Sequence, residues 1–348
     1  MSSRRRDLDE DDVRVRPGRG KSRPRSKERP AHDDADEGFV TAVDRGRFTC
    51  VLGTPDDPGT EVYAVKAREL GRKGVVVGDR VALVGDLTGA TDTLARVVRV
   101  EPRVTSLRRS ADDDDPIERI VVANADQLVI VTALADPEPR PRMIDRCLVA
   151  AYDAGLDPLL VLTKSDLRPA EELLAAYGAL DVPYVVTERH KPDPPVLHDL
   201  PQRLAGRVSV MIGHSGVGKS TLVNALVPDA ARATGHVNDV TGRGRHTSTS
   251  AVALELPGGG WVVDTPGVRS FGLAHVDPQR VFSSFPDLAA GTDECPRACT
   301  HDEPDCALDA WVAEGHAGSG GAARLVSLRR LLRSRSGDDD PEWTRGSA

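Results

Sequence analysis

The sequence predicts a multidomain protein: a small N-terminal β-barrel, a central α/β domain with a parallel sheet, and a C-terminal helical part built around a metal ion. Three observations predict this fold class. Short β-rich runs divided by turn residues fill positions 38–102, strands and helices then alternate as far as about residue 274, and a cluster of cysteine and histidine residues follows. With 348 residues, the chain exceeds the usual size of one domain, which is about 100–200 residues.

Composition excludes two classes of protein. The chain contains no run of about 18 consecutive apolar residues, so we predict no membrane-spanning helix. Its N-terminus is rich in charged residues and lacks the apolar stretch of a secretory signal. Five cysteines are an odd number, and three of them lie close together, which fits a metal site better than a set of disulfides. We therefore expect a cytoplasmic protein that has no membrane partner.

Charge is distributed unevenly along the chain. The net charge is −8, yet residues 1–30 are rich in arginine and lysine, interspersed with proline, glycine and serine. A segment of this kind cannot bury enough apolar surface to fold alone, so residues 1–37 are predicted to be a disordered basic arm and residues 336–348 a disordered tail. The arm fits two roles equally well: a solubilising extension, or a polyelectrolyte that contacts phosphate groups.

Five short strands are predicted between residues 38 and 102, divided by turn signals at 54–59 and 77–79. They are expected at residues 39–43, 47–52, 61–65, 80–84 and 94–100. Five strands in so short a segment fit a small barrel of the OB-fold type. Strand number alone reveals no ligand. Because few aromatic residues lie on these strands, a base-stacking surface for single-stranded nucleic acid has weak support.

The pattern changes after Pro102 to alternating strands and helices. Apolar runs of strand length occur at residues 127–134, 159–162, 182–186 and 208–212. Between the first two, apolar residues recur three or four positions apart, which is the spacing of a helix face. Strand–helix–strand alternation predicts a parallel sheet covered by helices on both faces.

A phosphate-binding loop follows the strand predicted at 208–212. Its sequence matches G-x-x-x-x-G-K-[ST] between an apolar strand and a helix, the context that gives this pattern its meaning; the residues are Gly213, His214, Ser215, Gly216, Val217, Gly218, Lys219, Ser220 and Thr221. Glycines let successive backbone N–H groups point at phosphate oxygens, and the helix N-terminus adds its positive dipole end. Lys219 is expected to contact the β- and γ-phosphates and Ser220 to ligate Mg²⁺. The loop predicts a nucleotide site without choosing the base.

Two further motifs indicate guanine. Asp264-Thr265-Pro266-Gly267 follows an apolar strand, so Asp264 is placed to hold Mg²⁺ through water and the Gly267 N–H to contact the γ-phosphate. Thr163-Lys164-Ser165-Asp166 follows the strand at 159–162. The Asp166 carboxylate matches the N1–H and exocyclic amine of guanine, while the stem of Lys164 fits the purine face. Thr163 stands where a side-chain amide is usual. A helix N-cap at Ser165 or Asp166 is the competing interpretation, and it loses weight beside the phosphate loop.

Four residues with metal-binding side chains lie within twelve positions: Cys295, Cys299, His301 and Cys306. Three thiolates and one imidazole are what a closed, tetrahedral structural Zn²⁺ site requires. Buried free cysteines are the simpler alternative. A catalytic metal is less expected, because protein ligands fill all four positions.

The nucleotide motifs occur in permuted order. In ordinary GTPases the phosphate-binding loop comes before the guanine-binding motif, but here Asp166 precedes Lys219 by 53 residues. A parallel sheet allows this, because chain ends that lie close together can be joined and the chain opened elsewhere. The opening falls just after Gly267, so the loop that senses the γ-phosphate leads directly into the C-terminal segment. The nucleotide state is therefore expected to act on that segment.

With the barrel before these motifs and the cysteine–histidine cluster after them, the chain resembles the ribosome small-subunit-dependent GTPase A family over about residues 38–335. The predicted domains are an OB-like barrel at 38–102, a circularly permuted P-loop GTPase domain at 103–274 and a zinc-binding helical domain at 275–335. The resemblance implies Mg²⁺-dependent GTP hydrolysis stimulated by the 30S ribosomal subunit, and binding to the rRNA of that subunit. It also implies a role in late 30S maturation, with release coupled to hydrolysis; we expect a monomer that alternates between GTP and GDP.

The segment at residues 242–249 is expected to be the switch that supplies a hydroxyl to Mg²⁺. Thr247 and Ser248 are the leading candidates, Thr249 is a third, and the sequence does not choose among them. His246 is a candidate for orienting or polarising water, with a surface histidine in a mobile loop as an equal alternative. Val268 replaces the glutamine that orients water in Ras-like enzymes, so intrinsic hydrolysis should be slow until a partner orders the switch.

Other functions also fit the sequence. The chain is either a GTPase that acts as a small-subunit assembly checkpoint, an RNA-binding module with nucleotide as a structural latch, or a permuted GTPase for the large subunit or another RNA. A C-terminal helix carries arginines around a leucine face at residues 324–333. A solvated helix and a surface that docks on RNA have equal support there.

Overall fold

The structure is a computed structural model that describes residues 32–71, 74–90, 92–110, 118–189, 194–228, 251–265, 273 and 276–336. All contacts reported below lie within Asp34–Ala348, which forms one compact unit. Some residues that the sequence singles out lie outside the described part. They are most of the basic arm, the tail from residue 337, and His246, Thr247, Ser248, Thr249, Gly267 and Val268.

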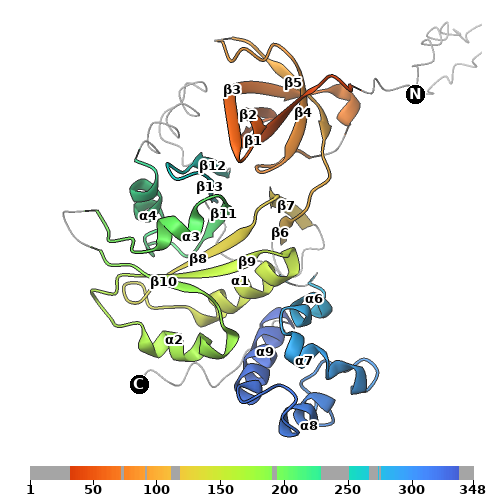
Figure 1. The fold of residues 1–348 in the computed structure, drawn as a ribbon, viewed down its shortest axis with the longest axis vertical. Coiled ribbons are helices and arrows are strands. Elements are labelled where there is room, and N and C mark those ends of the chain that lie inside the picture. The colour runs from red at the N-terminus through yellow and green to blue at the C-terminus, as the bar shows by residue number, and fades with distance from the viewer. Residues whose placement is uncertain are drawn as a thin grey trace, which may run out of the picture. The chain divides into compact units, whose positions relative to one another are not determined.

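A closed five-stranded barrel lies at the N-terminal end of the described chain (Figure 1). Its strands are β1 (Asp36–Asp44), β2 (Arg47–Thr54), β3 (Asp57–Lys66), β4 (Arg80–Gly85) and β5 (Ala95–Val100). They follow the order β1-β2-β3-β5-β4, and β1 also pairs with β4 to close the ring. Side chains such as Val40, Cys50 and Leu83 fill the interior. The predicted OB-like barrel is confirmed, although the turn expected at 54–59 is shorter, because β3 already begins at Asp57.

Six strands form the centre of the molecule, and they belong to the same 11-stranded sheet as the strands of the barrel. The six strands are β8 (Gln127–Ala133), β9 (Asp157–Thr163), β10 (Tyr184–Val186), β11 (Val208–Ile212), β12 (Val252–Glu255) and β13 (Trp261–Asp264). The order is β10-β9-β8-β11-β13-β12. All neighbouring strands are parallel except β12 and β13. The carboxyl ends of β8, β9, β10, β11 and β13 therefore meet at one edge of the sheet.

Helices cover both faces of this sheet, as the alternation predicts. The helices are α1 (Pro141–Ala154), α2 (Glu171–Tyr177), α3 (Leu200–Leu204) and α4 (Lys219–Leu226), and a short 3₁₀ turn, η3, follows α2 at Gly178–Leu180. Leu128 of β8 lies in the core that α1 and α2 cover, and its neighbour Val129 lies in the core that α3 and α4 cover. Successive residues of one strand thus enter opposite cores, which is why apolar residues follow one another without interruption from Leu128 to Val131.

The sequence missed one pair of strands. β6 (Ser106–Ser110) and β7 (Glu118–Ala123) form a separate antiparallel ribbon between the barrel and β8. These strands carry several charged residues, so the hydrophobic alternation that reveals a half-buried strand is weak. Between these strands the sequence has four consecutive aspartates at residues 112–115, a pattern that predicts a solvated loop, and they lie outside the described residues.

Hydrogen bonds and ring contacts join the barrel to the central sheet. β1 pairs with β12, with Ala42 opposite Val252. The indole N–H of Trp261, at the start of β13, donates to the Pro55 carbonyl at 2.9 Å, and its ring lies 5.3 Å from that of Phe39. A second junction uses Asn124, whose Nδ2 donates to the Gly78 carbonyl at 2.9 Å. The barrel is therefore attached by specific contacts as well as by the chain.

Gly78 provides a test of this second junction. Its φ is +89°, and a Cβ on it would lie 1.9 Å from the Ala123 carbonyl oxygen. We expect Gly78→Ala to lower the free energy of unfolding by about 3 kcal/mol or more, since it combines left-handed strain with a backbone collision. Gly46 is the control, because its φ is +87° but nothing lies within 4 Å of its Cβ position; Gly46→Ala should cost only about 1 kcal/mol. Equal losses in urea unfolding would contradict the importance of the Gly78–Ala123 contact.

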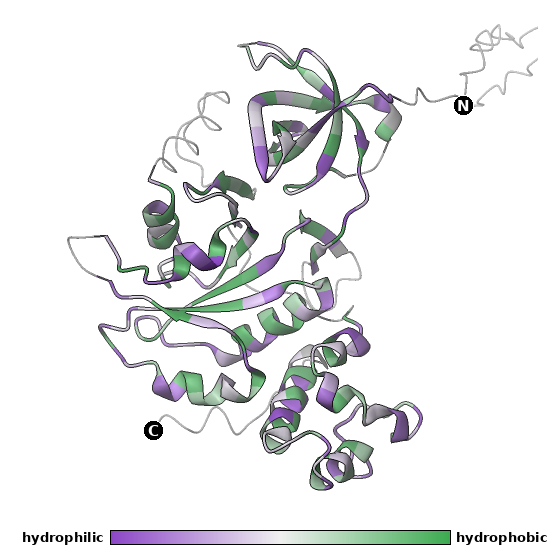
Figure 2. Cartoon of the chain, in the orientation of Figure 1, coloured by the Kyte–Doolittle hydropathy of each residue, from purple (hydrophilic) through white to green (hydrophobic). Residues whose placement is uncertain are grey.

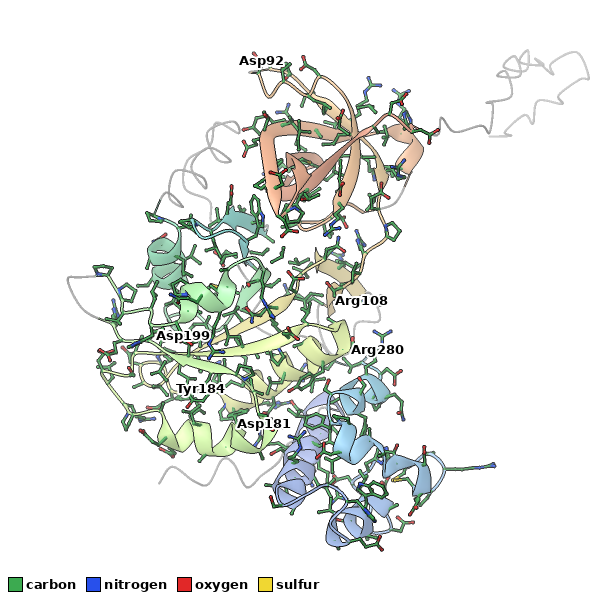
Figure 3. The ribbon with its side chains drawn as sticks, in the orientation of Figure 1. Asp92, Arg108, Asp181, Tyr184, Asp199 and Arg280 are labelled. Carbon is green, nitrogen blue, oxygen red and sulfur yellow. The ribbon has the colours of Figure 1, made fainter. Side chains whose placement is uncertain are left out.

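The C-terminal part is helical, with α6 (Pro278–Ser283), α7 (Pro286–Ala289), η4 (Thr292–Glu294), α8 (Ala307–Ala313) and α9 (Gly321–Ser336). Leu328 and Leu331 of α9 are fully buried in the core that also holds α1, and Arg280 of α6 pairs with Asp153 of α1 at 3.6 Å (Figure 3). Hydrophobic residues gather along β8, β9 and α1 (Figure 2). Among the described helices, none has the length and apolar character needed to cross a membrane.

Candidate nucleotide-binding site and metal cluster

The phosphate-binding loop connects β11 to α4. Gly216 and Gly218 have φ values of +83° and +100°, which favour glycine, and a Cβ on Gly213 would lie 2.3 Å from the Val131 carbonyl oxygen. The ammonium of Lys219 donates to the carbonyls of Gly213 and His214. The lysine thus folds back over its own loop, at the place where its charge would meet phosphate oxygens.

Asp264 lies beside this loop, because β13 pairs with β11 and sets Asp264 opposite Met211. Burial raises the pKa of Asp264, and the nearby charge of Lys219 partly offsets that effect. The next residue, Thr265, anchors the chain by donating from its hydroxyl to the Met211 carbonyl at 3.0 Å. A lysine and a half-buried carboxylate are therefore held together at the edge where a phosphate-bound cation would sit.

The motif at residues 163–166 reaches the phosphate-binding loop from the adjacent strand end. The Thr163 hydroxyl donates to the Val217 carbonyl at 2.6 Å, so the residue that replaces the usual asparagine ties the two loops together. Lys164 has a φ of +62°, and its ammonium donates to the Asp136 carbonyl. The backbone N–H of Ser165 donates to the Thr187 carbonyl at 3.3 Å. Hydrogen bonds thus connect the motif to three other segments of the chain.

A cavity of about 410 Å³ brings the two motifs together, and this volume is in the usual range for small-molecule sites. Its walls come from both sequence motifs and from the segment after β10. The lining residues are Thr163, Lys164, Thr187, Glu188, Arg189, Pro195, His214, Ser215, Gly216, Gly218, Lys219, Ser220, Thr221 and Leu222. Asp166 is not among these residues, but its Oδ1 accepts a hydrogen bond from the N–H of the lining residue Arg189 at 3.0 Å.

The sequence only partly identified the third wall. Thr187 and Glu188 directly follow the strand predicted at 182–186, which makes them candidates for a base-contacting loop, whereas no sequence pattern marks Arg189 and Pro195. Val196 bridges back to Glu188 through two backbone hydrogen bonds of 3.1 and 3.4 Å, which brings Pro195 to the cavity. The position of this segment in the sequence could have identified it, because it follows β10, which ends at the same sheet edge as β9 and β11.

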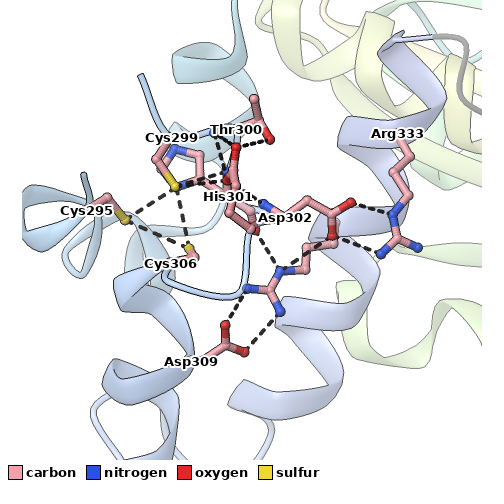
Figure 4. Close-up of polar contacts among 10 residues, drawn as sticks. Cys295, Cys299, Thr300, His301, Asp302, Cys306, Asp309 and Arg333 are labelled. Atoms are coloured by element: carbon pink, nitrogen blue, oxygen red, sulfur yellow. Dashed lines mark hydrogen bonds and ion pairs between the residues drawn. The ribbon is translucent and has the colours of Figure 1, made fainter. Parts of the chain in front are cut away.

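The four cysteine and histidine residues converge in the C-terminal part (Figure 4). One ligand atom from each of Cys295, Cys299, His301 and Cys306 lies within 4.8 Å of all the others. The Cys295 Sγ lies 3.5 Å from His301 Nδ1 and 3.9 Å from Cys306 Sγ. A tetrahedral zinc ion with Zn–S of about 2.3 Å and Zn–N of about 2.0 Å requires separations of roughly 3.5 and 3.8 Å. The donor set and its spacing therefore fit a tetrahedral ion.

Neighbouring residues affect the protonation of His301 and the conformation of the loop that carries the cysteines. Burial lowers the pKa of His301, which favours the neutral imidazole that binds metals. The ring of Phe282 packs edge-on against His301 with 4.4 Å between ring centres. Glu303 accepts hydrogen bonds from the Thr300 N–H and hydroxyl, and these bonds, with one from Cys299, lower its pKa to about 2. The loop between Cys299 and Cys306 is thereby shaped by its own side chains.

Comparison with known proteins agrees with these features. Residues 100–274 match the family model of the RsgA GTPase. The small ribosomal subunit biogenesis GTPase RsgA of Pseudomonas putida is 41% identical over 274 residues, 76% of each chain. That of Ectopseudomonas mendocina is 43% identical over 227 residues, 63% of this chain and 64% of the relative.

Solved structures show the same architecture. YjeQ from Thermotoga maritima superposes with a TM-score of 0.61 at 27% identity, covering 87% of this chain and 99% of the other. YloQ, described as a circularly permuted GTPase, has a TM-score of 0.61 at 20% identity, covering 90% and 99%, and supports the fold. The family model spans half of the chain and the P. putida relative three quarters of it, so this chain belongs to the RsgA GTPase family.

Proposed function

We propose that the protein is a Mg²⁺-dependent GTPase that acts in late maturation of the 30S ribosomal subunit, binds the rRNA of that subunit and leaves it when GTP is hydrolysed. The observation that carries this proposal is that one cavity is lined by both Lys219 and Lys164; this supports a nucleotide whose phosphates contact the first motif and whose base contacts the second. The names of the relatives support the ribosomal role.

The residues of the site have distinct proposed roles. Asp166 would turn from the Arg189 N–H toward the edge of guanine, and Lys219 would exchange the carbonyls of Gly213 and His214 for phosphate oxygens. Ser220 and Asp264 would hold Mg²⁺, which neutralises charge on the phosphates when bound. The proposed roles of Gly267 at the γ-phosphate, of Thr247 or Ser248 at Mg²⁺ and of His246 at water rest on the sequence.

Further parts of the proposal concern the metal and the domains. We propose zinc for the cysteine–histidine cluster, since three thiolates and an imidazole with no open position are typical of structural zinc. The domain limits proposed from the sequence are 1–37, 38–102, 103–274, 275–335 and 336–348, and β1 moves the start of the barrel to Asp36. The protein is proposed to act as a monomer in the cytoplasm, where ribosomal subunits mature.

Single-turnover hydrolysis of GTP, with and without purified 30S subunits, tests this function. Slow hydrolysis that 30S subunits accelerate at least tenfold is the expected result, and Lys219→Ala should abolish it. Acceleration by 50S subunits alone would favour a large-subunit role, while a rate unchanged by either subunit would favour a nucleotide latch. If 30S subunits accelerate hydrolysis, the protein should also co-sediment with them in sucrose gradients in the presence of a GTP analogue, but not in the presence of GDP.

A further inference from the structure

Four arginines of α9 contact acidic side chains of the same chain. The ion pairs are Arg324 with Asp181 and Asp287, Arg329 with Asp309, Arg330 with Asp145, and Arg333 with Asp302. A solvated helix and an RNA-docking face are equally compatible with the sequence of this helix. The structure shows a third use of these four arginines, because each is paired with an acidic partner within the protein; Arg333 and its partner Asp302 are labelled in Figure 4.

Arg329 holds the metal-binding loop by two kinds of contact. Its Nε donates to the backbone carbonyl of the ligand His301 at 2.7 Å. Its two terminal nitrogens donate to the two carboxylate oxygens of Asp309, at 3.0 and 2.7 Å, three residues after the ligand Cys306. A planar guanidinium group that makes a bidentate pair fixes direction as well as distance. Arg329 thus connects the chain at His301 to the helix that begins after Cys306.

The charge of a loaded cluster favours a cation at this position. Three thiolates, one neutral imidazole and one Zn²⁺ sum to a net charge of −1. The side chain of Arg329 is only 16% exposed, so solvent screens its charge weakly. The guanidinium group therefore lies where it offsets the negative charge of the thiolates.

The same helix is fixed to the nucleotide-binding domain. Nε of Arg330 lies 3.1 Å from the carboxylate of Asp145 on α1, which is 5% exposed, and the Arg330 guanidinium group stacks over Tyr177 at 4.9 Å. Arg329 and Arg330 are adjacent in α9 but contact different parts of the protein. Arg329 contacts the loop that carries His301, and Arg330 contacts α1. Movement of the loop relative to α9 would break the Arg329 contacts.

We propose that Arg329 is a positioning residue of the metal centre, which fixes the backbone at His301 and balances the negative charge of a zinc ion bound by three cysteines and one histidine. This rests on the proposed zinc site. Arg333 assists by a bidentate pair with Asp302 at 2.8 and 2.9 Å, but its 40% exposure makes the contribution smaller.

Zinc retention by the full-length protein tests the proposal. We expect Arg329→Gln to weaken zinc affinity by about 10- to 100-fold, the usual effect of removing a residue that supports a metal ligand, measured as release to a chromogenic chelator. When Co²⁺ is loaded in place of zinc, the thiolate-to-metal absorption of Arg329→Gln should be weaker than that of the unmodified protein. Arg324→Gln is the matched control, because Arg324 is on the same helix, 18% exposed and paired with two aspartates. It should retain zinc within about twofold of the original chain.

The outcomes separate the proposed metal from the proposed residue. If the unmodified protein binds no zinc, the metal assignment is wrong. If it binds zinc and Arg329→Gln releases the ion no faster than Arg324→Gln, the role of Arg329 is overturned. Should Arg329→Gln fail to fold, Arg329→Lys and Arg324→Lys are compared, since lysine keeps the charge and loses the bidentate geometry. Faster release from Arg329→Lys supports the proposal, and equal release from both overturns it.

Discussion

Asp166→Asn is expected to lower the affinity for GTP by at least about 100-fold and to create binding of xanthosine triphosphate. One oxygen of the Asp166 carboxylate accepts a hydrogen bond from the N–H of Arg189, which lines the cavity, and the carboxylate is proposed to accept two hydrogen bonds from guanine. Hydrogen bonds to a charged group are worth about 1.5–3 kcal/mol each, and every 1.4 kcal/mol is a factor of about ten in affinity. An asparagine amide donates where the carboxylate accepts, so it matches the 2-oxo group of xanthine.

Titration with fluorescent GTP, ATP and xanthosine nucleotides measures this change. Glu138→Gln is the control: Glu138 is an exposed carboxylate that pairs with Arg168 and does not line the cavity, so its loss should leave nucleotide preference unchanged. A protein that already binds ATP as well as GTP, or an Asp166→Asn variant that keeps its guanine preference, would contradict the assignment of the guanine-binding motif.

Local signals in the sequence predicted the parts of the site that depend on short spacing. The phosphate-binding loop needs glycine at 216 and 218 for a local reason, because both have a left-handed φ, whereas Gly213 is needed because a Cβ there would meet the distant Val131 carbonyl. The strand before the loop, β11, is mainly apolar because it is buried along its whole length. The permuted order was also visible, since motif order is a property of the chain.

Contacts between distant residues were not predictable in the same way. The Thr163 hydroxyl reaches Val217 across 54 positions, and sequence reasoning had treated Thr163 only as a weaker contact to the base. The arginines of α9 were assigned to solvent or RNA because a charged helix face has the same pattern whether its partner is water, nucleic acid or an aspartate elsewhere in the chain. Arg330 and Asp145 are 185 positions apart, and only the fold brings them together.

Removal of the metal is expected to have the largest effect on stability. Structural zinc contributes folding free energy, with apparent binding energies of about 10–16 kcal/mol in small zinc domains, and the cluster supplies the C-terminal helices with a centre that their short lengths cannot replace. Cys306→Ser should abolish stoichiometric zinc. It should also lower the thermal midpoint of the C-terminal part, because its thiolate is one of the four ligands. Excess chelator should produce the same shift in the unmodified protein.

Cys147→Ala distinguishes loss of metal from damage to the core. Cys147 is a fully buried cysteine of α1 outside the metal cluster, so its variant should be destabilised by a small cavity while keeping one zinc per chain. Its thermal midpoint should still fall on chelation, whereas that of Cys306→Ser should not change further. If chelation leaves the midpoint of the unmodified protein in place, the cluster does not stabilise the fold. The convergence of its four side chains would then need another cause. If the midpoint falls, loss of the metal should also weaken GTP binding. The reason is that α9 shares a core with α1 of the nucleotide-binding domain.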